Sequence, residues 1–144
     1  ARLSGTVRSL HPETSAALPV WIEQIVASVC QPYRAQYEVN YRRQVPSVQN
    51  DPALTQMIES AAREAWGGDR VQTLPEPSLG AEDFSLYLEH APGTMFRLGV
   101  GLSDKPNYPL HHPQFAVDES AIITGVVTLA FAAYQYWQQR VNLS

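Results

Sequence analysis

The sequence has 144 residues, of which 44% are hydrophobic and 17% are charged, so it is a chain that can fold and not a charge-rich disordered segment. The formal net charge is −4, and its 10 basic residues are scattered along the chain, which argues against the basic patch that nucleic-acid binding needs. A single cysteine, Cys30, excludes an intrachain disulfide and favours a reducing, cytoplasmic setting.

The first 44 residues predict a strand, a helix and a second strand. Apolar and polar residues alternate over 2–9 and again over 36–43, as in half-buried strands. Between them, apolar residues recur at intervals of three and four over 18–29, which is the spacing of one helix face. Pro19 predicts either a kink in this helix or its first turn.

The pattern changes over 45–50, where proline and a run of polar residues predict a linker. A helix is expected to start at Pro52, because Asp51 can accept hydrogen bonds from its first turn, and to end at Gly67.

The remaining segments predict short strands around 71–74 and 95–100, with a brief helix entered through 80–84. A loop rich in Gly and Pro over 101–113 leads to a last helix, for which Asp118 is the expected cap. The apolar stretch of that helix is too short to cross a membrane, which needs about 20 residues, so it predicts a helix that must be covered. The elements together predict an α/β fold, α+β overall.

His111 and His112 are the most suggestive residues for chemistry, because they lie between a Gly/Pro loop and a helix. In extended backbone neighbouring side chains point oppositely, so at most one of them should face a metal ion. The residues alone leave two alternatives open: a metal ligand, or a loop histidine bonded to the backbone. Carboxylates near helix starts, including Glu82 and Asp118, are better explained as acids that stabilise exposed N–H groups.

Five spaced segments, in this order, resemble the M20 peptidase family of metal-dependent amidohydrolases, especially the branch that hydrolyses N-acyl amino acids. They are Leu-Ser-Gly-Thr-Val-Arg-Ser at 3–9, Pro-Ser-Val-Gln-Asn-Asp at 46–51, Gly-Ala-Glu-Asp-Phe at 80–84, Pro-Gly at 92–93, and Leu-His-His-Pro-Gln-Phe at 110–115, followed by Asp-Glu at 118–119. The resemblance covers essentially the whole chain.

The resemblance implies an α/β catalytic domain with an inserted α+β lid that also forms a homodimer. Residues 1–44 would be the second half of this lid, 45–50 a linker, and 51–144 the C-terminal part of the catalytic domain. The absence of a start methionine before Ala1 looks like a cut inside a longer parent protein, so we expect the chain to be a fragment.

The resemblance also implies chemistry for the parent protein. Two divalent metal ions, which Mn, Zn, Co or Ni could supply, would activate water for attack on an amide carbonyl, and a glutamate would take its proton. The Leu-His-x-Pro motif places the final histidine ligand at His111 and makes His112 its variable neighbour. Further candidates for the same cleft, as substrate-binding or supporting residues, are Gly80, Ala81, Glu82 and Arg8, the last of which would either stabilise the lid or meet a substrate carboxylate.

The chain has no match for the family's general base, its other ligands or its lid histidine. We therefore expect no catalytic residue in this chain, no stably bound metal and no activity of the chain alone, so that the enzyme assignment belongs to the parent protein. The alternative is a noncatalytic dimerisation or binding module with the same fold. Neither reading involves nucleic acid or a membrane.

Overall fold

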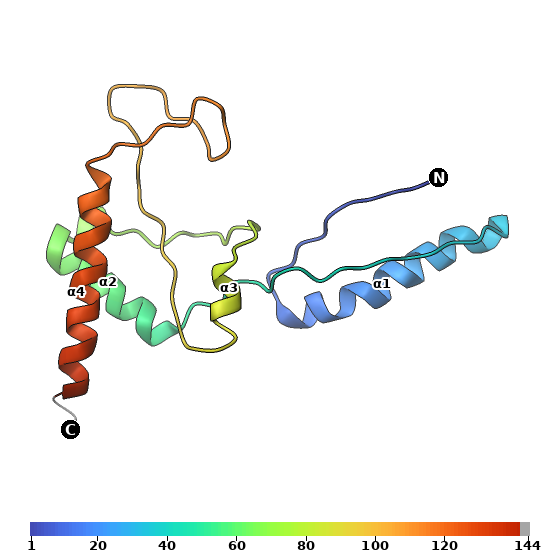
Figure 1. Ribbon diagram of the computed structural model, residues 1–144, viewed down its shortest axis with the longest axis horizontal. Coiled ribbons are helices and arrows are strands. Elements are labelled where there is room, and N and C mark those ends of the chain that lie inside the picture. Colours follow the sequence, from blue (N-terminus) through green and yellow to red (C-terminus); the bar gives the residue numbers. More distant parts are fainter. Residues whose placement is uncertain (142–144) are drawn as a thin grey trace. The chain divides into compact units, whose positions relative to one another are not determined.

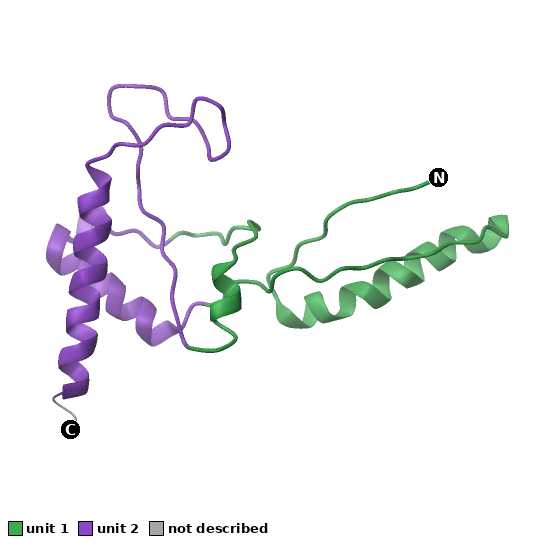
Figure 2. Ribbon diagram, in the orientation of Figure 1, with its two compact units in different colours: residues 1–49, 74–91 green, residues 50–73, 92–144 purple. Residues whose placement is uncertain are grey.

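The computed structural model describes residues 1–141, which form two compact units. One unit consists of residues 1–49 and 74–91, and the other of residues 50–73 and the described residues from 92 onward (Figure 2). The helices are α1 (Pro12–Cys30), α2 (Pro52–Trp66), α3 (Phe84–Tyr87) and α4 (Ala121–Val141), with short 3₁₀ turns η1 (Gln31–Tyr33) and η2 (Gly68–Arg70) (Figure 1). None of the helices described is long and apolar enough to span a membrane.

The predicted α/β fold class, with a strand–helix–strand lid in residues 1–44, is wrong for this structure. Residues 1–141 contain helices but no strand and no sheet. Alternation over 2–9 and 36–43 is a local property of the sequence, whereas a strand also requires a second segment to exchange backbone hydrogen bonds with it. Neither segment has such a partner among the described residues, and the expected strands at 71–74 and 95–100 are missing for the same reason.

Two side-chain amides bind backbone groups that a neighbouring strand would otherwise pair. The Asn50 amide donates to the carbonyl of Met95 at 2.8 Å and accepts from its N–H at 2.9 Å. The Asn107 amide makes the same pair of bonds to Leu102, at 3.0 and 2.7 Å. An asparagine amide carries both a donor and an acceptor, so one side chain satisfies both backbone groups of one residue.

In the first unit, α1 starts earlier than the spacing of its apolar residues predicts. The helix begins at Pro12, where a missing N–H costs nothing, and Pro19 lies inside it. None of its residues is fully buried. Trp21 is 49% exposed and Ile25 is 62% exposed, so one apolar face of α1 is open to solvent within this unit.

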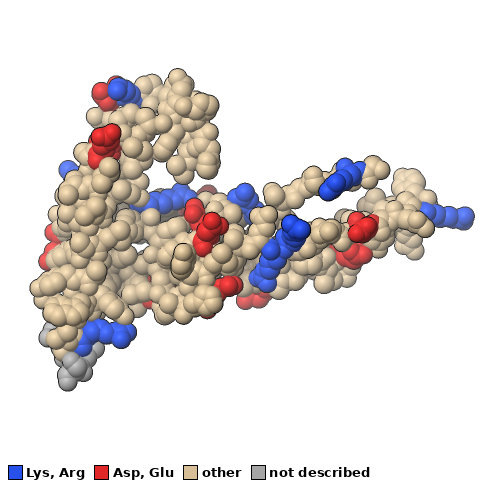
Figure 3. Space-filling view, in the orientation of Figure 1, with Lys and Arg blue, Asp and Glu red and all other residues tan. Residues whose placement is uncertain are grey.

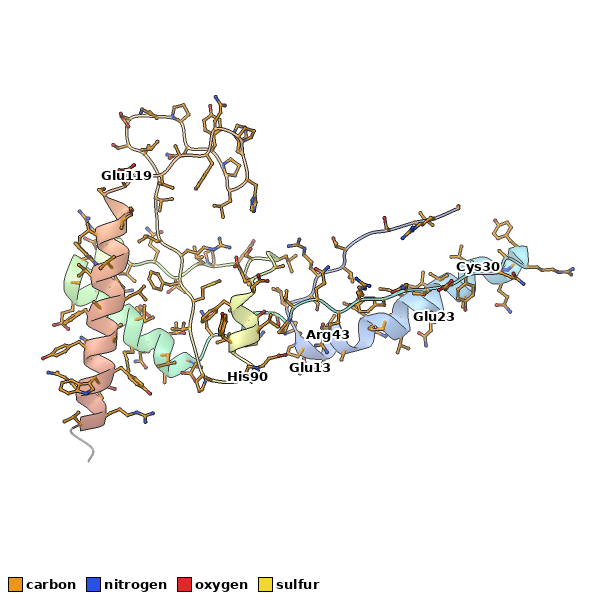
Figure 4. All side chains as sticks on the ribbon, viewed as in Figure 1. Glu13, Glu23, Cys30, Arg43, His90 and Glu119 are labelled. Atoms are coloured by element: carbon orange, nitrogen blue, oxygen red, sulfur yellow. The ribbon has the colours of Figure 1, made fainter. Side chains whose placement is uncertain are left out.

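The segment after α1 approaches this helix at Tyr37. Partial desolvation of the phenol raises its pKa, and the charge of Glu23 and a hydrogen bond to that carboxylate raise the pKa further. A nearby anion disfavours the phenolate, which is the charged form of tyrosine. Glu23 lies along α1 (Figure 4), so this contact connects the helix with the 36–43 segment.

In the second unit, α2 begins and ends as the sequence predicts. The Asp51 carboxylate accepts from the N–H of Leu54 at 2.9 Å, and Pro52 is the first helical residue. Gly67 follows the last turn with a φ of 88°, a conformation that glycine adopts without strain. Both predicted boundaries of this helix are confirmed.

The helices α2 and α4 pack against each other, and their buried residues are small. Ala61, Ala121 and Ala132 are buried, and Thr128 is 3% exposed. The indole N–H of Trp66 donates to the Thr128 hydroxyl at 3.0 Å, and that hydroxyl donates to the Thr124 carbonyl at 2.8 Å. Small side chains let the two helices approach closely, and one hydroxyl between them is fully hydrogen bonded.

The start of α4 differs in detail from the prediction. The first helical residue is Ala121, so Asp118 and Glu119 precede the first turn. Figure 4 labels Glu119 at the start of α4. The Asp118 carboxylate accepts from the N–H of Ser120 at 2.9 Å, and its carbonyl accepts from Ala121 at 3.0 Å. Asp118 therefore holds the turn that enters the helix and does not cap the helix itself.

Candidate functional site

The loop that carries the two adjacent histidines contains a tight turn centred on His111. The N–H of His112 donates to the Pro109 carbonyl at 3.1 Å, which closes a four-residue turn. His111 occupies its third position with a φ of 71°, whereas Leu110 before it has no positive φ. This is the pattern of a type II turn, in which the third position normally belongs to glycine or asparagine. A histidine there costs roughly 1–2 kcal/mol of backbone strain.

His112 is built into the loop through its ring and its backbone. The imidazole stacks on Tyr108, with ring centroids 4.4 Å apart and planes 9° from parallel. Its Nδ1 accepts from the N–H of Gln114 at 3.1 Å, and its carbonyl accepts from the N–H of Phe115 at 2.9 Å. His112 therefore connects the turn with the chain on both sides of it.

The His111 side chain, in contrast, is exposed and makes no hydrogen bond to the described part of the chain. The two alternatives that the sequence left open thus separate in space. The histidine bonded to backbone is His112, and the one whose ring nitrogens are free to bind something else is His111. A metal-ligand role for His111 stays a prediction. The alternative, a loop histidine bonded to the backbone, describes His112.

The other predicted site residues lie in the first unit, where one hydrogen bond brings them together. A guanidinium nitrogen of Arg8 donates to the Leu79 carbonyl at 2.7 Å, directly before Gly80 and Ala81. The Gly80 N–H donates to the Ser78 hydroxyl at 3.0 Å.

The segment continues into α3 through Glu82 and a buried serine. The Ser85 hydroxyl, 1% exposed, donates to the Glu82 carbonyl at 2.6 Å. The carboxylate of Asp83, which precedes α3, makes no capping bond. The expectation that acids in this segment cap the helix is thus not met at Asp83, and Ser85 holds the turn instead.

The model of peptidase family M20/M25/M40 matches residues 5–135 of the chain. The chain belongs to the M20 family. It is 70% identical over 138 residues to a probable hydrolase of Synechocystis sp., covering 95% of this chain and 35% of that protein. It is 37% identical over 140 residues to a putative amidohydrolase of Bacillus subtilis, covering 96% of this chain and 35% of the relative.

A third M20 relative has a more specific name. The N-acetyldiaminopimelate deacetylase of a Geobacillus strain is 36% identical over 139 residues, covering 96% of this chain and 35% of that enzyme. The chain thus spans about a third of the length of the relatives it matches. No solved structure matches it.

The residues described do not by themselves fit the metal centre that the resemblance to M20 amidohydrolases implies. A catalytic zinc site, for example, uses three protein ligands, and residues 1–141 hold no group of three or more His, Cys, Asp or Glu side chains that could bind one ion. His111 is one free imidazole. Any metal it binds would need its remaining ligands from elsewhere, so no catalytic step is assigned to this M20 chain alone.

Sequence reasoning missed Tyr108 and Ser85, which hold the two candidate segments in shape. The sequence did carry a signal for Tyr108. It precedes Pro109, and the residue before a proline is restricted to extended backbone. Ser85 follows the acids Glu82 and Asp83 at a helix start, where a hydroxyl commonly bonds a nearby backbone carbonyl. Both signals predict local bonding, but neither identifies the partner.

Proposed function

We propose that the protein to which this chain belongs is a hydrolase that cleaves the amide bond of N-acyl amino acids at a divalent metal centre, with His111 as one ligand. The names of the Bacillus and Geobacillus relatives, a putative amidohydrolase and an N-acetyldiaminopimelate deacetylase, support the reaction and the substrate class. Family membership supports the hydrolase class.

The observation that carries the proposal is the backbone of His111. Glycine or asparagine would fill the third position of this turn with less strain, yet the position holds a histidine with an exposed, unbonded imidazole. Strain of this kind is found where a side chain is needed for function. A neutral imidazole is a ligand for Mn, Zn, Co and Ni alike, so the metal is left open among these.

The segment near Arg8 is proposed to line the substrate cleft through Gly80, Ala81 and Glu82. The bond from Arg8 to Leu79 supports a bracing role, and it uses only one of the five N–H donors of a guanidinium. The remaining donors match a carboxylate in geometry, so Arg8 is a candidate to bind the carboxylate of the amino acid as well. Homodimer formation through residues 1–44 is part of the proposal, and the open apolar face of α1 supports it.

The experiment compares histidine variants in the full-length natural protein that contains this chain. His111→Ala should lower the bound metal and remove most hydrolysis of N-acetyl and N-benzoyl amino acids. His90→Ala is the matched control, because it removes an imidazole that makes no side-chain hydrogen bond to described residues. Metal content is measured by elemental mass spectrometry and turnover by release of the free amino acid. Normal metal content and turnover in His111→Ala would overturn the ligand assignment.

His111→Asn separates the ligand role from the turn. Asparagine tolerates the left-handed conformation better than alanine does, so the turn should persist while the imidazole is lost. Loss of metal in this variant as well would assign the effect to the side chain. If the unmodified protein hydrolyses no N-acyl amino acid with added Mn or Zn, the noncatalytic binding module is the better interpretation.

A further inference from the structure

We infer that the apolar side of α4 that α2 leaves open is an interface inside the parent protein, covered by the part of that protein outside this chain. This surface, the open face of α4, consists of Ile122, Val126, Leu129, Ala133 and Trp137. The inference concerns the packing of the parent protein and does not depend on the reaction proposed above.

The open face is one continuous side of the helix. Its residues follow one another at intervals of three and four, which is the spacing that places side chains on the same side of an α-helix. The four larger side chains are 54–62% exposed. Thr128, which binds the indole of Trp66 on α2, lies on another side of α4. Packing against α2 therefore covers only part of an apolar helix.

The two helices differ in the side chains that they present to the outside. On α2, the carboxylate of Glu59 and the guanidinium of Arg63 form an exposed ion pair at 2.8 Å. On α4, no charged residue occurs from Ala121 to Gln139, and the surface over α4 that faces the viewer in Figure 3 is tan along most of its length. A helix with one charged side is typical of a protein surface, whereas a helix that is apolar all round is typical of an interior. We therefore assign α2 to the outside of the parent protein and α4 to its interior.

The surroundings of the open face favour a cover from the same polypeptide. Interfaces between separate proteins have an apolar centre and a polar rim, but the open face is flanked by the exposed apolar residues Ile123 and Ala130. Uncovered apolar surfaces of this width are rare on soluble proteins. The chain spans about a third of the length of its M20 relatives, so most of a protein of that length remains to supply an apolar surface that fits. A second copy is the other occupant to test, because permanent homodimer interfaces are also apolar.

The first experiment measures the accessibility of single cysteines in the full-length natural protein. Leu129→Cys places a thiol on the open face. Gln56→Cys is the matched control on α2, where Gln56 is exposed and makes no side-chain hydrogen bond to described residues. Reaction with a maleimide is followed by mass spectrometry of the peptide that carries the new thiol, so that other cysteines do not interfere.

The thiol of Leu129→Cys should react at least about tenfold more slowly than that of Gln56→Cys, because it becomes accessible only when the structure opens locally. In the 144-residue chain at nanomolar concentration, the two thiols should react at similar rates. Equal rates in the full-length protein would overturn the inference, and so would slow reaction of Leu129→Cys in the dilute chain. Protection that disappears when the full-length protein is diluted would assign the open face to a second copy and overturn it as well.

The second experiment detects a contact between copies that dilution does not separate. Leu129→Glu puts a carboxylate on the open face, and a charge buried without a partner is strongly destabilising. The full-length variant should be insoluble, or keep its oligomeric state with a Tm lowered by about 5 °C or more. Gln56→Glu, the control on α2, should change the Tm by less than about 2 °C. A Leu129→Glu variant with unchanged Tm, or one that changes from dimer to folded monomer in light scattering, would refute the inference and leave the proposed function untouched.

Discussion

Replacing Thr128 with valine should destabilise the packing of α2 against α4. The Thr128 hydroxyl is buried, and it accepts from the Trp66 indole while donating to the Thr124 carbonyl. Valine has the same shape but offers no acceptor, so the indole N–H is left without a partner. Helix propensities of threonine and valine are nearly equal and do not contribute.

The size of the effect follows from the exposure of the unpaired groups. A buried donor left unsatisfied costs about 1–3 kcal/mol, whereas a hydrogen bond that water can replace contributes about 1 kcal/mol or less. Trp66 is half-buried, so water reaches part of the indole, and the Thr124 carbonyl keeps its place in the helix. The free energy of unfolding should therefore fall by about 1 kcal/mol, near the lower end of that range.

Urea unfolding of the 144-residue chain, followed by far-ultraviolet circular dichroism, measures this change. Thr73→Val is the control, since Thr73 is exposed and makes no side-chain hydrogen bond to described residues. A double-mutant cycle with Trp66→Phe isolates the pair, and neighbouring groups that interact typically show coupling of at least about 0.5 kcal/mol. A Thr128→Val variant as stable as the unmodified chain, with no coupling to Trp66→Phe, would refute the reasoning.

Three further predictions concern function, pH and association. The 144-residue chain alone, with Mn²⁺ or Zn²⁺ added, should hydrolyse N-acetyl amino acids no faster than the buffer blank, and reproducible metal-dependent hydrolysis would contradict this. Hydrogen bonds from the side chain and then the N–H of Ser120 lower the pKa of Asp118 below its ordinary value of 3.8. Asp118 thus stabilises the fold above that value, and this stabilisation is lost as the pH falls through the folded-state pKa. Asp118→Asn should therefore flatten the acid side of the plot of unfolding free energy against pH. An unchanged plot would count against the hydrogen bonds between Asp118 and Ser120. The exposed face of α1 should make the chain self-associate at micromolar concentration, and Trp21→Ser should shift light scattering towards the monomer; a monomer in both cases would exclude this face as the contact.

The helices show how far local patterns reach. Asp51, Pro52 and Gly67 predict both ends of α2, because caps, the first helical position and the glycine stop act within one turn of the chain. The start of α1 was predicted too late, because its first turn contains Glu13, Thr14 and Ser15 and so lacks the apolar spacing used to find it. Helix formation depends on near neighbours in the sequence, so errors are confined to a few residues.

The strands show where local patterns stop. Alternation over 2–9, 36–43 and 95–100 predicts backbone with two different faces, but it says nothing about which segment pairs with it. In this structure the partner of Met95 is the side chain of Asn50, not a strand. Pairing is decided between residues far apart in the chain. For that reason the α/β prediction failed, whereas every predicted helix formed and only the starts of α1 and α4 differed.

The same division applies to the candidate site. The sequence by itself determined the family, through the spacing of its motifs, and singled out the adjacent pair His111 and His112. Only the tertiary structure decided which of the two is bonded into the loop. That depends on the positive φ of His111 and on the stacking of His112 on Tyr108. Adjacent residues of the same type share a composition and a local pattern, and they differ only in the direction that the folded backbone gives their side chains.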